Sequence, residues 1–285
     1  MKILLNDLLN LTEKQLDNSK IELNMTAGKA SDGSEVFIDR WLKTDQDKKE
    51  QGLTDCSYWG WYGEKRNFYP GQWVFSFIKL DYDEWMLISA AEIIDIPQKS
   101  RANVKILEQY KPYFGRLIIK YKKGNTYSRY VFKLKNLINE CEIKEILPAV
   151  FTGFDFPGYD NVSLTYEQLK TIVNGNYPSY HNALRNQKAV YLQTDKATGK
   201  MYVGSATAEK GMLLARWSSY VHNGHGGNEG LIELVKEKGF DYIKENFQYT
   251  ILENYNSKVD DEYVLKRESY WKEVFQSRKF GYNKN

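Results

Sequence analysis

The first half of the chain is rich in aromatic and β-branched residues that alternate with polar ones and are interrupted by turn signals. From about residue 36 to residue 149 this pattern predicts a β-rich region, with its clearest strands at 71–78 and 85–88. A less regular stretch, 151–158, follows, and the apolar spacing from Leu164 to Val173 then predicts a short connecting helix. We therefore expect a β-rich domain over residues 1–175 and a second domain over residues 176–285.

The last third of the chain mixes strand and helix periodicities. Two β-prone runs, 189–191 and 202–204, flank a polar turn at 195–200, a pattern typical of a hairpin. Two amphipathic helices are predicted at 211–221 and 228–238, the second with Asn228 as N-cap and Gly239 just past its end. The run 247–252 predicts a third strand, and Asp260 begins a long helix to about Ser277. We expect an α+β protein whose C-terminal part is a small antiparallel three-stranded sheet flanked by helices.

The hairpin places its two tyrosines in a defined way. Side chains alternate along a strand, so Tyr191 shares a face with Ala189 and Gln193, while Tyr202 shares one with Gly204. If the register brings these faces together, two phenols lie over one small cleft, beside a glycine that permits close approach of another group.

Composition adds few constraints. The chain has 285 residues and a formal net charge of +3, which permits nucleic-acid binding without requiring it. Cys56 and Cys141 lack metal-ligand spacing, so we expect reduced, buried or half-buried thiols. Residues 1–20 resemble neither a signal peptide nor a membrane span. We expect a cytoplasmic protein that does not bind membranes.

The long helix carries an acidic residue within its apolar stripe. The stripe runs through Val264, Glu268, Trp271 and Phe275, at spacings of four, three and four. Burying an unpaired carboxylate is costly, so Glu268 must meet a cation, hydrogen-bond donors or a metal ion, or lie at the wet edge of the stripe. A structural ion pair with Arg216 or a nearby lysine and a functional carboxylate both satisfy this requirement.

Arg216 lies next to Trp217 on the helix that follows the hairpin, and one turn before Tyr220. A guanidinium group suits phosphate because its fork of donors binds two oxygens at once. The alternative is an exposed arginine whose stem covers the tryptophan, as is common on protein surfaces.

Together these residues resemble the GIY-YIG nuclease superfamily, which includes homing endonucleases, some restriction enzymes and the nuclease module of a bacterial excision-repair enzyme. The two named triads match 189–191 and 202–204, with Ala189 in place of the first glycine and Val203 in place of isoleucine. The remaining family positions occur in the expected order over about residues 186–285: they match Arg216, Tyr220, Glu268 and Asn283.

The resemblance implies metal-dependent hydrolysis of a phosphodiester in DNA. Glu268 would hold Mg²⁺ or Mn²⁺, and Arg216 would bind a non-bridging phosphate oxygen. Tyr191 is the candidate general base, which requires a lowered pKa, with Lys200 or the metal as the cation that lowers it. Tyr202 and Tyr220 would orient water or phosphate, and Asn283 would fix the geometry.

A histidine and glycine segment at 222–227 offers a competing metal site. His222 and His225 have no cysteine or third histidine nearby, so we do not expect zinc. The glycines do not form a Walker pattern. We expect a flexible loop lining the cleft, with His222 as a weak candidate for a phosphate contact.

The first domain contains a basic stretch between residues 111 and 139 that has no acidic residue. A turn at 124–125 between alternating runs predicts a hairpin, with several tyrosines interleaved. Such a ribbon suits a DNA backbone, although a solvated outer face of an ordinary sheet fits equally well. The candidate DNA-binding residues are Arg116, Lys120, Lys122, Lys123, Arg129 and Lys133.

An aromatic cluster between Tyr58 and Trp73 would form either a core or a pocket for a flipped or modified base. We therefore expect a restriction or defence endonuclease with an N-terminal DNA-reading domain. Because each chain carries one site, a homodimer is one way to cut both strands. The alternatives are a structure-specific repair or recombination nuclease and a non-catalytic nucleic-acid-binding protein.

Overall fold

The computed structural model of the chain describes residues 2–25, 37–54, 61–62, 65–97, 101–123, 130–175, 177–207 and 212–285. The chain divides into two compact units, residues 1–152 and 153–285. The division lies earlier than the position near residue 175 that the pattern predicts. The strand and helices between residues 163 and 185 belong to the second unit because they pack against its sheet and helices.

The first unit is built on a mixed β-sheet, which has seven strands in the described part of the chain. In sheet order the strands are β8 (Val131–Lys133), β1 (Ser19–Asn24), β4 (Trp73–Lys79), β5 (Glu84–Asp95), β7 (Leu117–Lys120) and β9 (Glu142–Ile146), with β6 (Asn103–Ile106) paired to β5. The pair β1/β4 is parallel, and the other pairs are antiparallel. The strands predicted at 71–78 and 85–88 correspond to β4 and β5.

Short helices and a small hairpin complete this unit. They are α1 (Leu5–Leu9), α2 (Glu13–Asp17), α3 (Phe37–Leu42), α4 (Gln46–Glu50), the 3₁₀ turns η2 (Glu108–Tyr113) and η3 (Leu134–Asn136), and the strands β2 (Trp61–Tyr62) and β3 (Lys65–Arg66).

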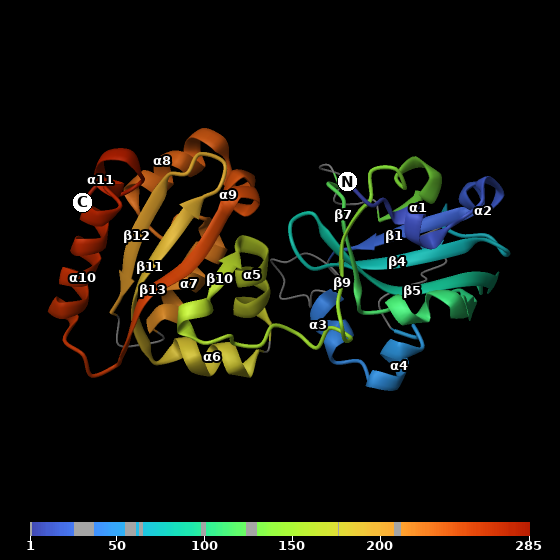
Figure 1. The fold of residues 1–285 in the computed structure, drawn as a ribbon, viewed down its shortest axis with the longest axis horizontal. Helices are drawn as coiled ribbons and strands as arrows, with labels where there is room; N and C mark the ends of the chain where they lie inside the picture. The colour runs from blue at the N-terminus through green and yellow to red at the C-terminus, as the bar shows by residue number, and fades with distance from the viewer. Residues whose placement is uncertain are drawn as a thin grey trace. The chain divides into compact units, whose positions relative to one another are not determined.

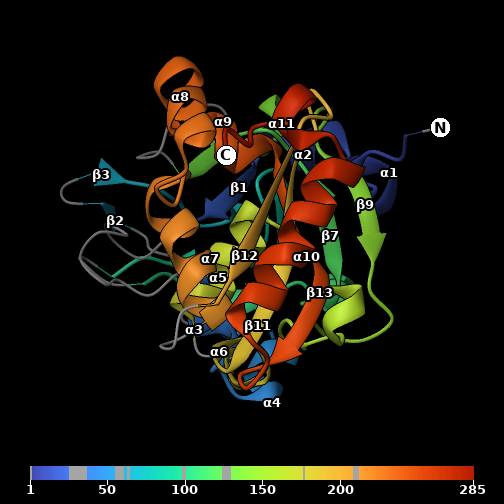
Figure 2. The ribbon, with the colours of Figure 1, turned by 90° about the vertical axis from the view of Figure 1, so that its left-hand side faces the viewer.

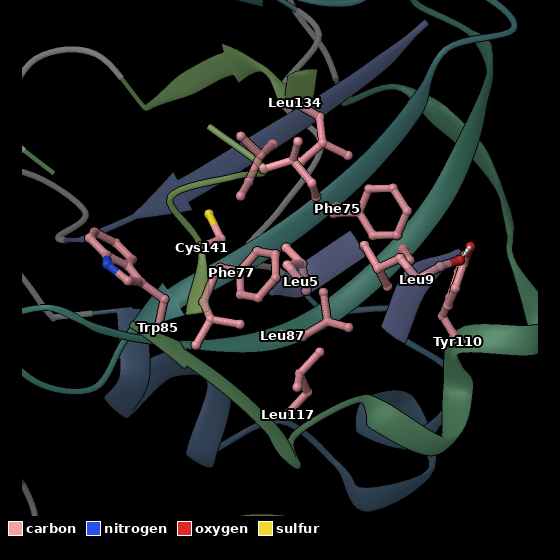
Figure 3. Close-up of a cluster of buried hydrophobic side chains, with 14 of the residues drawn as sticks. Leu5, Leu9, Phe75, Phe77, Trp85, Leu87, Tyr110, Leu117, Leu134 and Cys141 are labelled. Carbon is pink, nitrogen blue, oxygen red and sulfur yellow. Dashed lines mark hydrogen bonds between the residues drawn. The ribbon is translucent and has the colours of Figure 1, made fainter. Parts of the chain in front are cut away.

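The larger core of the first unit lies between one face of this sheet and α1, α2 and the 3₁₀ turns. Alternate residues of β4, such as Phe75 and Phe77, point into it together with Leu5 and Leu87 (Figure 3). Cys141 is fully buried among these side chains as a free thiol, as predicted, and burial raises its pKa to about 12. This thiol is therefore inert at neutral pH.

The second unit has a four-stranded antiparallel sheet in the order β10 (Ser163–Thr165), β13 (Phe247–Asn256), β11 (Gln187–Asp195) and β12 (Met201–Ala206). The three predicted strands are present, and β10 adds a fourth that the pattern did not reveal. The β11/β12 pair is the predicted hairpin. β12 is an edge strand, so one of its long sides faces no other strand of the sheet.

Helices cover both faces of this sheet (Figures 1 and 2). They are α5 (Tyr166–Asn174), α6 (Pro178–Arg185), α7 (Met212–Asn223), α8 (Glu229–Lys238), α9 (Phe240–Asn246), α10 (Asp261–Val274) and α11 (Ser277–Phe280), with a 3₁₀ turn η4 (Tyr159–Asn161). On one face Val190 and Val203 pack with Val264 of α10. On the other, Tyr191 packs edge-on against Trp217 of α7.

The long C-terminal helix begins at the predicted cap, where the Asp260 side chain accepts a hydrogen bond from the Glu262 amide. It ends at Val274, earlier than Ser277, because Gln276 adopts a left-handed backbone conformation with φ of 47°. Among the described residues, no helix combines the length and the apolar character needed to cross a bilayer.

Candidate functional site on the edge strand of the second unit

The register of the hairpin places the two tyrosines on one face of the sheet. Tyr191 lies opposite Gly204, and Tyr202 lies opposite Gln193. Directly opposed residues of antiparallel strands point to the same face, so the predicted sharing of a face is confirmed. The ring of Tyr191 covers Gly204 so closely that a Cβ there would lie 2.5 Å from its hydroxyl oxygen. The glycine is required at this position by the phenol opposite it.

Asn228 is at the centre of the hydrogen-bond network on this face. Its Oδ1 accepts from the hydroxyl of Tyr202 at 2.6 Å and from Nη2 of Arg216 at 3.1 Å. Its Nδ2 donates to the hydroxyl of Tyr220 at 2.8 Å, which is itself 2.8 Å from the hydroxyl of Tyr191. Asn228 occupies the predicted N-cap position of α8, but its side chain makes no capping bond. Instead, it joins the functional candidates into one cluster.

Arg216 is held rigidly in this cluster. Nε donates to the hydroxyl of Tyr191 at 3.0 Å, and Nη1 donates to the Gly226 carbonyl at 2.9 Å. With the Nη2 bond to Asn228, three of the five N–H groups of the guanidinium are used, and one on each terminal nitrogen remains. No carboxylate pairs with this half-buried cation within the described part of the chain. A fixed, desolvated cation of this kind favours an anionic ligand.

The pKa of Tyr191 moves in the direction opposite to the one we expected. Tyr191 is fully buried, and this burial raises its pKa well above the ordinary value, although Arg216 and the hydroxyl of Tyr220 oppose the shift. Lys200 does not act on it: its Nζ lies over the ring of Tyr282, 5.8 Å from the centroid. The phenol therefore stays protonated at neutral pH in this structure, which argues against its being a ready general base.

Glu268 projects toward the edge strand from the opposite face of the sheet. Its Oε2 accepts from the hydroxyl of Ser205 at 2.5 Å, and its Oε1 pairs with the ammonium of Lys272 at 2.8 Å. Of the alternatives left open for this carboxylate, the ion pair with a nearby lysine is present: the partner is one turn along α10 and is not Arg216.

The edge strand β12 carries residues of both faces: the hydroxyl of Tyr202 joins the Asn228 cluster, and that of Ser205 meets Glu268 of α10. Burial is the main reason that the pKa of Tyr202 is raised; the neighbouring Tyr220 adds to the shift, Arg216 opposes it, and Glu268 makes a smaller contribution in the raising direction.

Asn283 fixes the geometry of that edge. Its Oδ1 accepts from the Val203 amide at 2.9 Å and its Nδ2 donates to the Val203 carbonyl at 2.8 Å. The hydroxyl of Ser277 donates to the same Oδ1 at 2.7 Å. Asn283 is buried, so it is a positioning residue that supports the strand and does not itself meet a ligand.

The glycine loop after α7 supports the site by its backbone. Gly226 has a φ of 54°, and a Cβ there would lie 2.6 Å from the ring of Tyr220. Its carbonyl is the one that Arg216 binds. His225 accepts a hydrogen bond from the Gly227 amide through Nδ1, whereas His222 is exposed on α7. Where we expected a flexible loop, the described backbone is a tightly packed turn.

The donor groups of the described chain limit the kind of divalent-cation site that the sequence suggests. No group of three histidine, cysteine or acidic side chains that could hold a metal ion occurs among the described residues. Mg²⁺ is commonly held by one or two carboxylates together with substrate phosphates and water. Glu268, with the oxygen of Ser205 beside it, fits that kind of site.

The predicted basic ribbon of the first unit is not formed by its described strands. β7 and β8, which flank the turn, pair with other strands and are separated by β1, β4 and β5. Lys120 is therefore far from Lys133 across the sheet. Arg116 uses Nε and Nη1 to bind the carbonyls of Leu147 and Pro112.

The other candidate cations of this stretch have separate environments. Lys122 lies over the ring of Tyr82. Lys123 is partly buried, and burial together with Lys79 lowers its pKa to about 8. Arg129 and the turn at 124–125 lie outside the described residues, as do Tyr58 and Trp59 of the aromatic cluster. Of that cluster, Phe68 is fully buried, Trp73 is partly buried against the larger core, and Tyr69 is exposed.

Comparisons with known proteins yield one weak structural likeness. No protein-family model matches the chain, and no curated protein matches it. The solved catalytic domain of the homing endonuclease I-TevI is 20% identical, with a TM-score of 0.26, over 34% of this chain and 96% of that domain. A mutant of the same intron endonuclease domain is 22% identical, with a TM-score of 0.28, over 35% and 94%. At these TM-scores the side chains of the site, and not the overall likeness, support the proposal below.

Three residues of the site were not singled out from the sequence for their role in it: Asn228, Ser205 and Lys272. The sequence does give a signal at Asn228, an asparagine that follows two glycines at the start of a helix, but this signal predicts only a helix cap. Lys272 is one helical turn after Glu268, which is a detectable spacing for an ion pair. Ser205 had no signal, because only the register identifies it as the neighbour of Glu268.

Proposed function

We propose that this chain is a metal-dependent endonuclease of the GIY-YIG type that hydrolyses phosphodiester bonds in DNA. The observation that supports this most directly is the half-buried guanidinium of Arg216. It is fixed by three hydrogen bonds, lacks a carboxylate partner in the described chain and retains two N–H groups. A half-buried guanidinium that is fixed and has no carboxylate partner favours an anionic ligand, and a phosphate diester is an anion of suitable geometry.

Each neighbouring group has a task in this proposal. The two remaining N–H groups of Arg216 bind a non-bridging phosphate oxygen, where negative charge grows in the transition state. Tyr202 and Tyr220 keep Asn228 and Arg216 in register. Glu268 would hold Mg²⁺ or Mn²⁺, which, when bound, stabilises the leaving oxygen and the phosphate charge.

We assign Tyr191 a positioning role and not that of the general base. Its raised pKa makes tyrosinate scarce near neutral pH, and its hydroxyl is already bonded to Arg216 and Tyr220. Its hydroxyl therefore orients the guanidinium, and the attacking water loses its proton to another acceptor. In this proposal the pH–rate profile between about pH 6 and 8 carries no rise from the phenol.

The first unit is proposed to contact DNA, and a role in restriction or defence is the natural one for such an arrangement of two units. Cutting both strands would then need two chains acting as a homodimer or two successive nicks by one. Lys120, Lys122 and Lys133 remain proposed DNA contacts, whereas Arg116 and Lys123 hold positions that suit structural roles.

The test is incubation with Mg²⁺ and a panel of plain, modified and branched DNA duplexes. We expect cleavage by the wild type, none by Glu268→Ala, and a loss of about 10²–10³-fold in rate for Arg216→Ala, as for removal of an oxyanion-binding donor. Arg267→Ala is the matched control, since Arg267 lies on α10 and pairs with Glu253. Cleavage by Arg216→Ala at the wild-type rate would overturn the assignment of the phosphate contact.

A further inference from the structure

The carboxylate proposed to hold a divalent cation already has a cation beside it. Lys272 is 5% exposed, and its Nζ lies 2.8 Å from Oε1 of Glu268. The same ammonium donates to Oδ1 of Asn285 at 2.8 Å. The Lys272 ammonium is therefore fixed between Glu268 and Asn285, and its side chain is buried and not on the surface.

The second oxygen of the carboxylate is engaged too. The hydroxyl of Ser205 donates to Oε2 at 2.5 Å. Only 12% of the Glu268 side chain is exposed, so little water remains to stabilise a further charge. A carboxylate has about four lone-pair sites, so a cation still finds an oxygen lone pair there without displacing both partners.

Electrostatics makes this binding unfavourable while Lys272 is in place. An Mg²⁺ ion about 2.1 Å from a Glu268 oxygen would lie within a few ångströms of the ammonium. At such a separation the repulsion between the two cations is several times thermal energy, even with an effective dielectric constant of about 20. One carboxylate then has to balance three positive charges.

We propose that Lys272 is an internal counter-ion that keeps Glu268 closed to divalent cations in the free protein. The cation enters only together with the phosphate diester, whose oxygen supplies a second ligand and a further negative charge. This rests on the proposed function, because it takes Glu268 as the carboxylate of the metal site. Lys272 is in this sense a positioning residue that sets the order in which metal and DNA bind.

The test measures Mn²⁺ binding to the DNA-free protein by the loss of the electron paramagnetic resonance signal of free Mn²⁺. Lys272→Met keeps the length and apolar stem of the side chain and removes its charge. We expect at least tenfold tighter Mn²⁺ binding by Lys272→Met than by the wild type. Lys272→Arg, which keeps the charge, should bind as weakly as the wild type. The double variant Lys272→Met with Glu268→Gln should lose the gain, which assigns it to this carboxylate.

Thermal unfolding gives a second readout that does not depend on activity. Removing the ammonium leaves a mostly buried carboxylate without its cation, so Lys272→Met should unfold at a lower temperature. Added Mn²⁺ should then raise its midpoint more than that of the wild type, because a ligand stabilises the state that binds it. Circular dichroism checks that the variant is folded, and Lys272→Gln provides a second uncharged variant if it is not.

The outcomes separate this inference from the proposed function. Equal Mn²⁺ affinities of wild type and Lys272→Met, both lost in Glu268→Gln, would overturn the counter-ion role while leaving Glu268 as a metal ligand. Absence of Mn²⁺ binding in every variant would also overturn it. The binding data can support the inference even if no DNA is cleaved, in which case only the proposed nuclease function fails.

Discussion

Replacement of Gly204 by alanine is the sharpest test of how the sheet builds the site. The added Cβ would lie 2.5 Å from the hydroxyl oxygen of Tyr191 and 2.6 Å from its Cζ, whereas ordinary contacts begin at 3.4 Å. Gly204 does not have a positive φ, so the new side chain causes a clash without backbone strain. The effect of the variant is therefore confined to the fit between Gly204 and Tyr191.

The geometry sets the magnitude. Relief of the clash needs a displacement of about 0.9 Å, and Tyr191 cannot yield freely because it is fully buried against Trp217 and Tyr220. Overpacking of this kind costs about 1–3 kcal/mol, and the lower chain entropy of alanine offsets about 0.4–1 kcal/mol of it. A shift of that size also takes the 3.0 Å bond from Arg216 beyond hydrogen-bonding distance. We expect a net loss of about 1–2 kcal/mol in stability and about 10²-fold in cleavage rate.

The assay pairs denaturant unfolding with single-turnover DNA cleavage. Gly199→Ala is the matched control, since Gly199 lies in the turn of the same hairpin with a φ of 75° and nothing within 4 Å of the added Cβ. Backbone strain should lower its stability by about 1–2 kcal/mol while leaving the cleavage rate unchanged. A Gly204→Ala protein that cleaves as fast as the wild type would refute the reasoning, because Tyr191 would then not be holding Arg216 in place.

Three further predictions concern the supports of the site. Burial raises the pKa of Asp195, but hydrogen bonds to its carboxylate outweigh this and hold the pKa below its ordinary value. The stability that this carboxylate contributes is thus present above about pH 4 and is lost as pH falls. Urea unfolding from pH 6 to 3 should therefore show that Asp195→Asn loses less stability on acidification than the wild type does. Asn283→Ala should lose about 1–3 kcal/mol, measured by thermal unfolding, because it leaves both backbone groups of Val203 without their partner; an unchanged midpoint would contradict this. Asn228→Ala should raise the activation free energy of cleavage by more than it lowers the free energy of unfolding, because its side chain joins Tyr202, Arg216 and Tyr220. Equal changes in the two free energies would argue for a purely structural role.

Much of the second unit could be predicted because its local signals agree with one another. The hairpin, the two amphipathic helices and the cap at Asp260 were all predicted from periodicity and turn chemistry. The strand β10 was missed because it is three residues long and β13, with which it pairs, is distant in sequence. In the first unit the predicted ribbon failed for a related reason: β8 pairs with β1, a long-range contact that local alternation cannot reveal.

The sequence predicts which residues come together at the candidate site better than it predicts their protonation states. Tyr191, Tyr202, Arg216 and Tyr220 come together because strand register and helical spacing determine their faces. The state of Tyr191 could not be predicted, since the direction of its pKa depends on burial by residues far apart in the chain.

The amide of Asn283 has a consequence for the whole sheet. By pairing with both backbone groups of Val203, it imitates one residue of a neighbouring strand, while the Met201 carbonyl accepts from the Tyr282 amide. An exposed edge strand invites pairing with another protein chain, and these two residues block that pairing along the first half of β12. Among the described residues, no such backbone pairing covers the segment beyond Val203, beside Ser205 and Glu268. The first half of β12 is thus closed to edge-to-edge pairing, and its second half is the part that lies beside the carboxylate of Glu268.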